Sequence, residues 1–344
     1  MHTKLVQRHI LPLVGLTLIS FTVLIPQGAA AQASGYDVIL RGGRVFDGAG
    51  NPWVRSDVGI TDGRITAVGH LGEVPAEREI DVAGLYVMPG IIDAHSHANS
   101  GFDDEDPRAR ATINNLMQGI TTVVIGENGS AWGRDSSIKE KAEEWSRNGI
   151  GTNAAMLIGI DSVRYQVIDG HETTPTAQDL VKMRAIVREA MEDGAFGLSS
   201  ALDYWDGHFN TTEEIIALAK EVAPFGGIYA SHMRSEGTRS LWWVESHSSR
   251  RVTQLDAVKE IIEIGRAAEI PVHILHIKST GIPAWGDSRM ATALIEEARH
   301  QGIDVTANQY PYTFSNPDRS TQLFKWEPYL GETGRDLERT QRMA

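Results

Sequence analysis

From residue 90 onward, short runs of apolar residues alternate with longer segments in which apolar residues recur every three or four positions. The short runs have the length and composition of buried parallel strands, whereas the longer segments have the period of amphipathic helices. The predicted strands cover residues 91–97, 121–127, 154–160, 195–201, 227–232, 272–277 and 304–310. The predicted helices include residues 177–193, 213–222, 255–268 and 289–301. This alternation predicts an α/β fold, a (β/α)₈ TIM-type barrel of which seven strands are visible.

The eighth strand of such a barrel is not visible, because the residues after Tyr312 are rich in Pro, Gly and charged side chains. We therefore expect the chain to end before the barrel closes, so that residues 89–344 form an incomplete barrel domain. An open barrel exposes unpaired strand edges, which costs stability. We accordingly expect the 344-residue chain alone to be inactive.

The residues before the barrel have a different, shorter rhythm. Between residues 36 and 87, apolar and polar positions alternate, and turns are predicted at Gly42-Gly43, Asp62-Gly63 and Ala83-Gly84. Period-two alternation broken by such turns is typical of short strands with one buried face. Residues 34–88 are therefore predicted to form a small antiparallel β subdomain.

The first 33 residues have the pattern of a secretory signal peptide. Lys4 and Arg8 precede an apolar run over residues 10–25, and small residues follow up to Ala33. This order of basic, apolar and small residues predicts cleavage after Ala31 or Ala33 and a periplasmic or extracellular protein. A retained membrane anchor is the alternative, because the apolar run is almost long enough to span a bilayer.

Charge and cysteine content narrow the partners and the chemistry. The net charge of −13, without a compensating basic block, argues against nucleic acid or an anionic membrane surface as a partner. The absence of cysteine suits an oxidising compartment and excludes thiolate ligands and cysteine nucleophiles. Any metal must therefore be held by histidine and carboxylate side chains.

Candidate metal ligands stand at the ends of four predicted strands. His95 and His97 are two residues apart at the end of the first strand, so that both can point to one face. Glu127 ends the second strand, His232 the fifth, and His276 lies near the end of the sixth. The ends of parallel barrel strands share one rim, so these five side chains are predicted to converge on a metal site. His273 is expected to face the opposite side and is read as structural.

Seven segments, in this order, resemble the amidohydrolase superfamily and, within it, the N-acyl-D-amino-acid deacylase (D-aminoacylase) group. They read DVILRGGRVFDGAGNP, GIIDAHSHAN, GITTVVIGENG, GAFGLSSALDY, YASHMRSEG, VHILHIKSTG and NQYPYTFS. The resemblance implies a zinc-dependent hydrolase that cleaves the amide of an N-acylated D-amino acid. It also implies that the small β subdomain is half of a β-sandwich.

By the same resemblance, His95, His97, His232 and His276 match the histidine ligands of one or two zinc ions. In well-known D-aminoacylases the second-strand motif is GNCG and its cysteine is a ligand; here Asn128 stands at that position, and Glu127 is the proposed substitute.

Substrate contacts are implied in the same way. Lys278 and Tyr310 match family residues that contact the substrate carboxylate or the scissile carbonyl. Arg234 is a weaker candidate for the carboxylate, with a surface or rim position as the alternative. The family's general acid/base aspartate would lie beyond residue 344, so the catalytic residue is left unassigned.

Two other readings stay open at this point. A cyclic-amide hydrolase of the dihydroorotase or hydantoinase kind, or a dipeptidase, would use the same metal ligands. A non-catalytic, exported, metal-holding binding protein is the second. In the enzyme readings the partner is a small-molecule amide, and the acyl group, the amino acid and the oligomeric state are not predicted.

Overall fold

The structure, a computed structural model, describes residues 35–126, 129, 137–168, 172–240 and 252–310. The predicted signal peptide therefore lies outside the described residues. The chain divides into two compact units, Met1–Pro89 and Gly90–Ala344, and each is treated by itself below.

The first unit contains a mixed five-stranded sheet. Its strands are β1 (Tyr36–Val45), β2 (Val54–Thr61), β3 (Arg64–Gly69), β4 (Ala76–Asp81) and β5 (Tyr86–Val87). The order is β3-β2-β1-β4, and β5 also pairs with β1. β1 and β2 are antiparallel, as predicted, but β4 and β5 run parallel to β1, so the prediction of a purely antiparallel unit is wrong. Apolar alternation reports which face of a strand is buried and carries no information on the direction of its neighbour.

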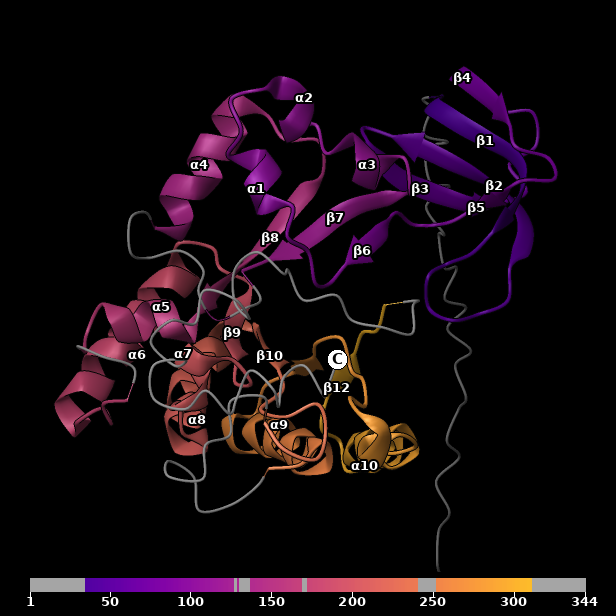
Figure 1. Ribbon diagram of the computed structural model, residues 1–344. Coiled ribbons are helices and arrows are strands. Elements are labelled where there is room, and N and C mark those ends of the chain that lie inside the picture. The colour runs from indigo at the N-terminus through magenta and orange to yellow at the C-terminus, as the bar shows by residue number, and fades with distance from the viewer. Residues whose placement is uncertain (1–34, 127–128, 130–136, 169–171, 241–251, 311–344) are drawn as a thin grey trace, which may run out of the picture. The chain divides into compact units, whose positions relative to one another are not determined.

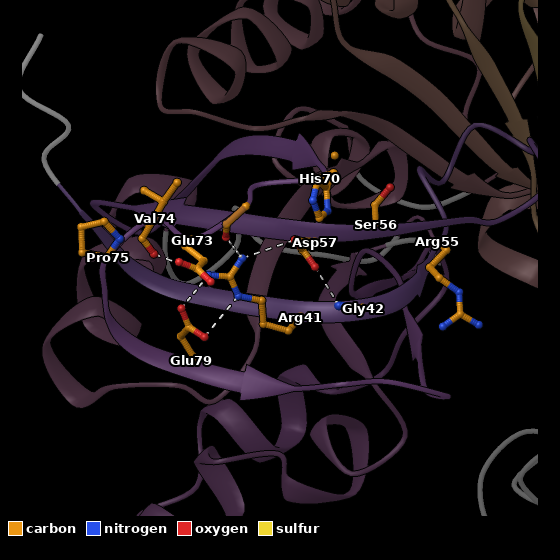
Figure 2. Close-up of a pocket in the computed structure, with 12 residues that line it drawn as sticks. Arg41, Gly42, Arg55, Ser56, Asp57, His70, Glu73, Val74, Pro75 and Glu79 are labelled. Atoms are coloured by element: carbon orange, nitrogen blue, oxygen red, sulfur yellow. Dashed lines mark hydrogen bonds and ion pairs between the residues drawn. The ribbon is translucent and has the colours of Figure 1, made fainter. Parts of the chain in front are cut away.

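An open cavity of about 1050 Å³ lies in this unit, lined mainly by polar and charged side chains (Figure 2). Arg41 is its central cation: its Nη2 lies 2.6 Å from Glu79 Oε1, and its Nη1 donates to Asp57 Oδ2 at 3.3 Å and to the carbonyl oxygen of Gly72 at 2.9 Å. The Arg41 donors are thus directed at groups of the same unit. We assign the network to holding the crossing from β3 to β4 against β1.

The second unit is built on a parallel sheet, as the barrel prediction requires. Its strands are β6 (Ile91–Asp93), β7 (Ile120–Ile125), β8 (Asn153–Gly159), β9 (Gly197–Ala201), β10 (Ile228–His232), β11 (Val272–Ile274) and β12 (Val305–Ala307). They pair in chain order, each parallel to its neighbours. All seven predicted barrel strands are confirmed within the described residues.

Helices follow the strands on the outer side of this curved sheet (Figure 1). The longer ones are α4 (Ile138–Asn148), α5 (Ile160–Tyr165), α6 (Ala177–Glu192), α8 (Thr212–Val222), α9 (Gln254–Ala268) and α10 (Ser288–His300). Single turns are α1 (Asn99–Phe102), α2 (Pro107–Arg110), α3 (Ile113–Leu116), α7 (Trp205–His208) and the 3₁₀ turns η1 (Ala223–Phe225) and η2 (Ile282–Ala284). No helix in the described part of the chain is long and apolar enough to cross a membrane.

Local sequence explains where the long helices begin. The hydroxyls of Thr176, Thr211 and Thr253 each accept a hydrogen bond from the backbone N–H three residues later, which caps α6, α8 and α9. Each of these helices buries one apolar stripe, and α6, α8, α9 and α10 pack side by side in that order. The helices therefore cover the outer face of the sheet. Along each strand, side chains that face the helices alternate with side chains that point into the barrel.

The alternation along β10 decides which of its side chains point into the barrel. Tyr229 is fully buried in the main core between sheet and helices, whereas Ala230 packs with Leu157 and Leu275 in a separate small cluster. Residues two apart in a strand share a face. His232 therefore lies on the same face as Ala230, at the carboxyl end of the strand.

Candidate metal centre

Four histidines from the ends of three strands form one cluster. His95 follows β6, His232 ends β10 and His276 follows β11. The ring centroids of His95 and His276 are 4.7 Å apart, those of His232 and His276 4.4 Å, and those of His95 and His97 5.4 Å. The structure thus brings together the four histidines that the sequence analysis selected.

The His95-His97 pair is presented differently from the prediction. β6 ends at Asp93, so the strand predicted over residues 91–97 is too long. The Asp93 carboxylate accepts a hydrogen bond from the His95 N–H at 3.1 Å, and the Ser96 N–H donates to the Val124 carbonyl at 3.0 Å. The rings therefore converge from a turn that is anchored on β7, and not from adjacent same-face positions of a strand.

Glu127 and Asn128 lie outside the described residues, and the role of Glu127 as a bridging ligand stays a prediction. The residues on either side of them are described. Fully buried Ser199 on β9 donates its hydroxyl hydrogen to the Gly126 carbonyl and accepts a hydrogen bond from the Gly129 N–H at 3.3 Å.

Burial lowers the pKa of His95, His97 and His232 and so favours the neutral form that binds metals. His232 is only 4% exposed, and neither of its ring nitrogens has a hydrogen-bond partner among the described residues. Burial lowers the pKa of His232 to about 3, although the nearby Glu236 carboxylate opposes this shift. Burial, followed by the charge of His276, also lowers the pKa of His95 to about 3. Buried imidazole nitrogens without partners are unfavourable unless a ligand satisfies them, so this donor set fits a metal ion.

Glu236 is a member of the cluster that the sequence analysis missed. Its Oε1 lies 3.0 Å from His276 Nδ1 and 3.5 Å from His232 Nε2, and it accepts a hydrogen bond from Lys278 Nζ. His232, Glu236 and His276 form a group whose ligand atoms lie within 4.8 Å of one another. The sequence offers one signal for Glu236, its position four residues after His232. An acidic residue at that spacing is too common to identify a site residue by itself.

The His276 backbone adopts an unusual conformation that a distant residue supports. Its φ is +34°, a value that side-chain-bearing residues rarely adopt. Asn308, just after β12, accepts the His276 N–H through its side-chain oxygen and the Ile277 N–H, at 2.9 Å, through its carbonyl, while its own N–H donates to Ile274 at 3.1 Å. These hydrogen bonds stabilise the turn that directs the His276 ring into the cluster.

The three predicted substrate-binding residues lie in two places. Lys278 joins the cluster, with Nζ 2.9 Å from His276 Nδ1 and 5.5 Å from the ring centroid of Tyr310. Arg234 instead forms an ion pair with Glu260 at 2.8 Å, and donates to the carbonyls of His208 and Asn210 at 3.0 and 2.7 Å. Lys278 and Tyr310 are therefore adjacent to the histidines, whereas the Arg234 donors face Glu260 and a neighbouring loop. Contact of Arg234 with substrate stays a prediction.

A parallel strand-helix sheet with histidines gathered at the strand ends defines the class of metal-dependent barrel hydrolases. The comparison with known sequences agrees: the amidohydrolase family model matches residues 78–307. The chain belongs to the amidohydrolase family.

Two relatives are similar over most of the chain. A D-aminoacylase of Alcaligenes xylosoxydans xylosoxydans is 32% identical over 332 residues, covering 88% of this chain and 65% of that protein. The crystal structure of N-acyl-D-glutamate deacylase from Bordetella bronchiseptica, complexed with zinc and a phosphonate inhibitor, superposes with a TM-score of 0.68 at 31% identity, covering 81% of this chain and 59% of the other. The chain thus spans less than two thirds of the length of each.

An L-hydantoinase from Arthrobacter aurescens is more distant. It superposes with a TM-score of 0.55 at 19% identity, covering 88% of this chain and 61% of that protein. This likeness extends to the fold alone, so the cyclic-amide alternative has weaker support than the deacylase prediction.

Proposed function

We propose that the protein hydrolyses the amide bond of N-acylated D-amino acids with the help of zinc. The observation that carries the proposal is the cluster of His95, His97, His232 and His276, whose members come from the ends of three strands of an amidohydrolase-family barrel. The similarity to a D-aminoacylase and to a zinc-bound N-acyl-D-glutamate deacylase supports the substrate class.

In this proposal the four histidines hold one or two zinc ions, together with Glu127 as the predicted bridging carboxylate. When bound, zinc polarises the scissile carbonyl and supplies hydroxide near neutral pH. The cluster itself contributes four imidazoles, of which His232 is buried, that lie together before the metal binds, which limits the cost of ordering on binding.

Lys278 and Tyr310 are proposed to orient the substrate. The Lys278 side chain is 17% exposed, and its ammonium group lies beside His276, where it can attract the carboxylate or the carbonyl oxygen of an N-acyl amino acid. Burial lowers the pKa of Lys278, and the Glu236 carboxylate opposes that shift and so favours the charged form. Tyr310 lies beside both Lys278 and His276, at 6.5 Å between the Tyr310 and His276 ring centroids.

The experiment that tests this proposal is an activity assay of the zinc-loaded protein, produced from its complete natural reading frame. We expect hydrolysis of N-acetyl-D-amino acids, with much slower reaction of the L enantiomers and of hydantoins, and loss of activity when a chelator removes the metal. Turnover is followed by release of the free amino acid. Zinc binding without turnover of any amide would contradict the proposal and support the non-catalytic, metal-holding alternative; faster turnover of hydantoins would support the cyclic-amide alternative.

We also propose that the protein is exported. The basic, apolar and small-residue order of residues 4–33 supports a cleaved signal peptide. Expression in a Gram-negative host should yield periplasmic protein that begins near Gln32 or Ser34, as read by N-terminal sequencing. Soluble cytoplasmic protein that retains Met1 would contradict export, and membrane-bound protein with the same N-terminus would indicate a retained anchor.

A further inference from the structure

One Glu236 oxygen faces a ring nitrogen of each of two predicted metal ligands. Glu236 Oε1 lies 3.0 Å from His276 Nδ1 and 3.5 Å from His232 Nε2, and the side chain is only 12% exposed. Each histidine therefore has one nitrogen next to the carboxylate and a second nitrogen on the other side of its ring. His232 Nδ1 is buried without a hydrogen-bond partner among the described residues.

We propose that Glu236 is a positioning residue that selects the ring tautomer of His276, so that His276 Nε2 is the atom that binds the metal. This inference rests on the proposed function, because it takes His276 as a metal ligand. A neutral imidazole binds a metal only through the nitrogen that lacks a proton, and a hydrogen bond to the other nitrogen sets which one that is.

Two hydrogen-bond patterns are conceivable for His276 Nδ1, because it lies next to both Glu236 and Lys278. Its ammonium Nζ is 2.9 Å from His276 Nδ1 and also donates to Glu236 Oε1. If Lys278 donated to Nδ1, the proton would sit on Nε2 and the ring could not bind a metal through that atom. A carboxylate only accepts, and an ammonium only donates. The Lys278 ammonium has two acceptors that carry no proton, Glu236 Oε1 and, at 3.3 Å, the His276 carbonyl oxygen. We take these as its acceptors, which leaves the His276 Nδ1–H to donate to Glu236.

The same arrangement places the Lys278 charge next to a paired carboxylate. The Lys278 ammonium offsets the negative charge of Glu236, whose side chain is 12% exposed beside the His232 and His276 rings, and a paired charge costs less to bury than an isolated one. Removing the Glu236 charge should therefore disturb both the His276 tautomer and the position of Lys278. We expect this to appear as weaker zinc binding, of about 10- to 100-fold, as is typical when the partner of a ligating histidine is lost.

The test is zinc affinity of Glu236→Gln, measured by competition with a chromophoric chelator. Glu221→Gln is the matched control, because Glu221 is also a buried carboxylate, 6% exposed, that pairs with Arg184 and Arg188 outside the cluster. We expect zinc binding to weaken about 10- to 100-fold in Glu236→Gln and to be unchanged in Glu221→Gln. Unchanged affinity in Glu236→Gln would overturn the inference.

Two further measurements separate positioning from direct ligation. In the cobalt-substituted protein, positioning predicts the same coordination number in wild type and Glu236→Gln, whereas a lost direct ligand would change the visible absorption spectrum and overturn the inference. In the unaltered metal-free protein, ¹⁵N NMR should find His276 protonated on Nδ1. The His276 signal is assigned by its absence from the spectrum of His276→Asn. Protonation of His276 on Nε2 would also overturn the inference. None of these readouts uses substrate, so a zinc-binding protein without deacylase activity would contradict the proposed function alone.

Discussion

Replacing His232 with asparagine is expected to lower kcat/KM for an N-acetyl-D-amino acid by at least about 1,000-fold, because zinc binding is needed to bring the pKa of a bound water from about 15.7 to about 7. His232 is the most buried of the four clustered histidines, at 4% exposure, and lacks a hydrogen-bond partner in the described part of the chain. The measurements are turnover and bound zinc per chain, both expected to fall together.

His273 provides a matched control on the neighbouring strand β11. Its Nδ1 lies 2.7 Å from the Thr306 hydroxyl oxygen, and it is not one of the four clustered histidines. His273 pairs in register with Ala230 and therefore faces the same side of the sheet as Ala230, so the prediction that it faces the opposite side is wrong. His273→Gln should keep the zinc content and turnover of the unaltered protein. If His232→Asn bound zinc normally and turned over substrate normally, the assignment of His232 as a ligand would be wrong.

Replacing Arg164 with methionine is expected to lower the free energy of unfolding by about 3–5 kcal/mol at neutral pH, because it leaves a buried carboxylate without its partner. Arg164 on α5 and Glu214 on α8 are 3% and 4% exposed, and Arg164 Nη1 contacts both Glu214 oxygens at 2.5 and 2.6 Å. Arg164 also donates to the Thr173 carbonyl at 2.8 Å. Urea unfolding followed by circular dichroism measures the change.

The loss of folding stability in Arg164→Met is expected to change with pH in one direction. Burial raises the pKa of Glu214 even with Arg164 in place, which opposes the shift. Without Arg164 the folded-state pKa rises further above the unfolded value, so the loss of stability is largest at high pH and shrinks as the pH falls toward about 4. A deficit that did not vary with pH would contradict the role of the unpaired carboxylate.

An exposed arginine serves as the control for Arg164. Arg184 is 45% exposed and shares Glu221 with Arg188, so Arg184→Met should cost no more than about 1 kcal/mol. The double variant Arg164→Met with Glu214→Leu should recover much of the lost stability, because it removes the buried charge altogether.

The sequence by itself was sufficient for the barrel strands and for the helices α6, α8, α9 and α10, but α4 and α5 were not among the predicted helices. The signal of the predicted elements is local: an apolar run of strand length or a period of three to four residues occurs within each segment. The predicted helix over residues 177–193, for example, differs by one residue from α6, Ala177–Glu192. The order of strands in the parallel sheet then follows from short connections between consecutive elements.

The four histidines could also be selected from the sequence, because each stands at or just beyond the end of an apolar strand and such ends share one rim of a barrel. The local backbone geometry that presents these histidines could not be predicted from the sequence. The end of β6 at Asp93 depends on hydrogen bonds from His95 and Ser96, and the second of these reaches Val124 on another strand. The parallel placement of β4 beside β1 is likewise a pairing between segments, which alternation within one segment does not encode.

Only the tertiary structure identified Glu236 and Asn308 as parts of the site. Glu236 is 42 residues from Lys278 in the chain, and Asn308 is 32 residues from His276, yet each contacts its partner directly. A glutamate or an asparagine has no sequence signature for such a contact, because the hydrogen bond forms only once the strands are assembled. Local periodicity thus determined which elements form, and the packing of distant segments decided which polar side chains orient the histidines.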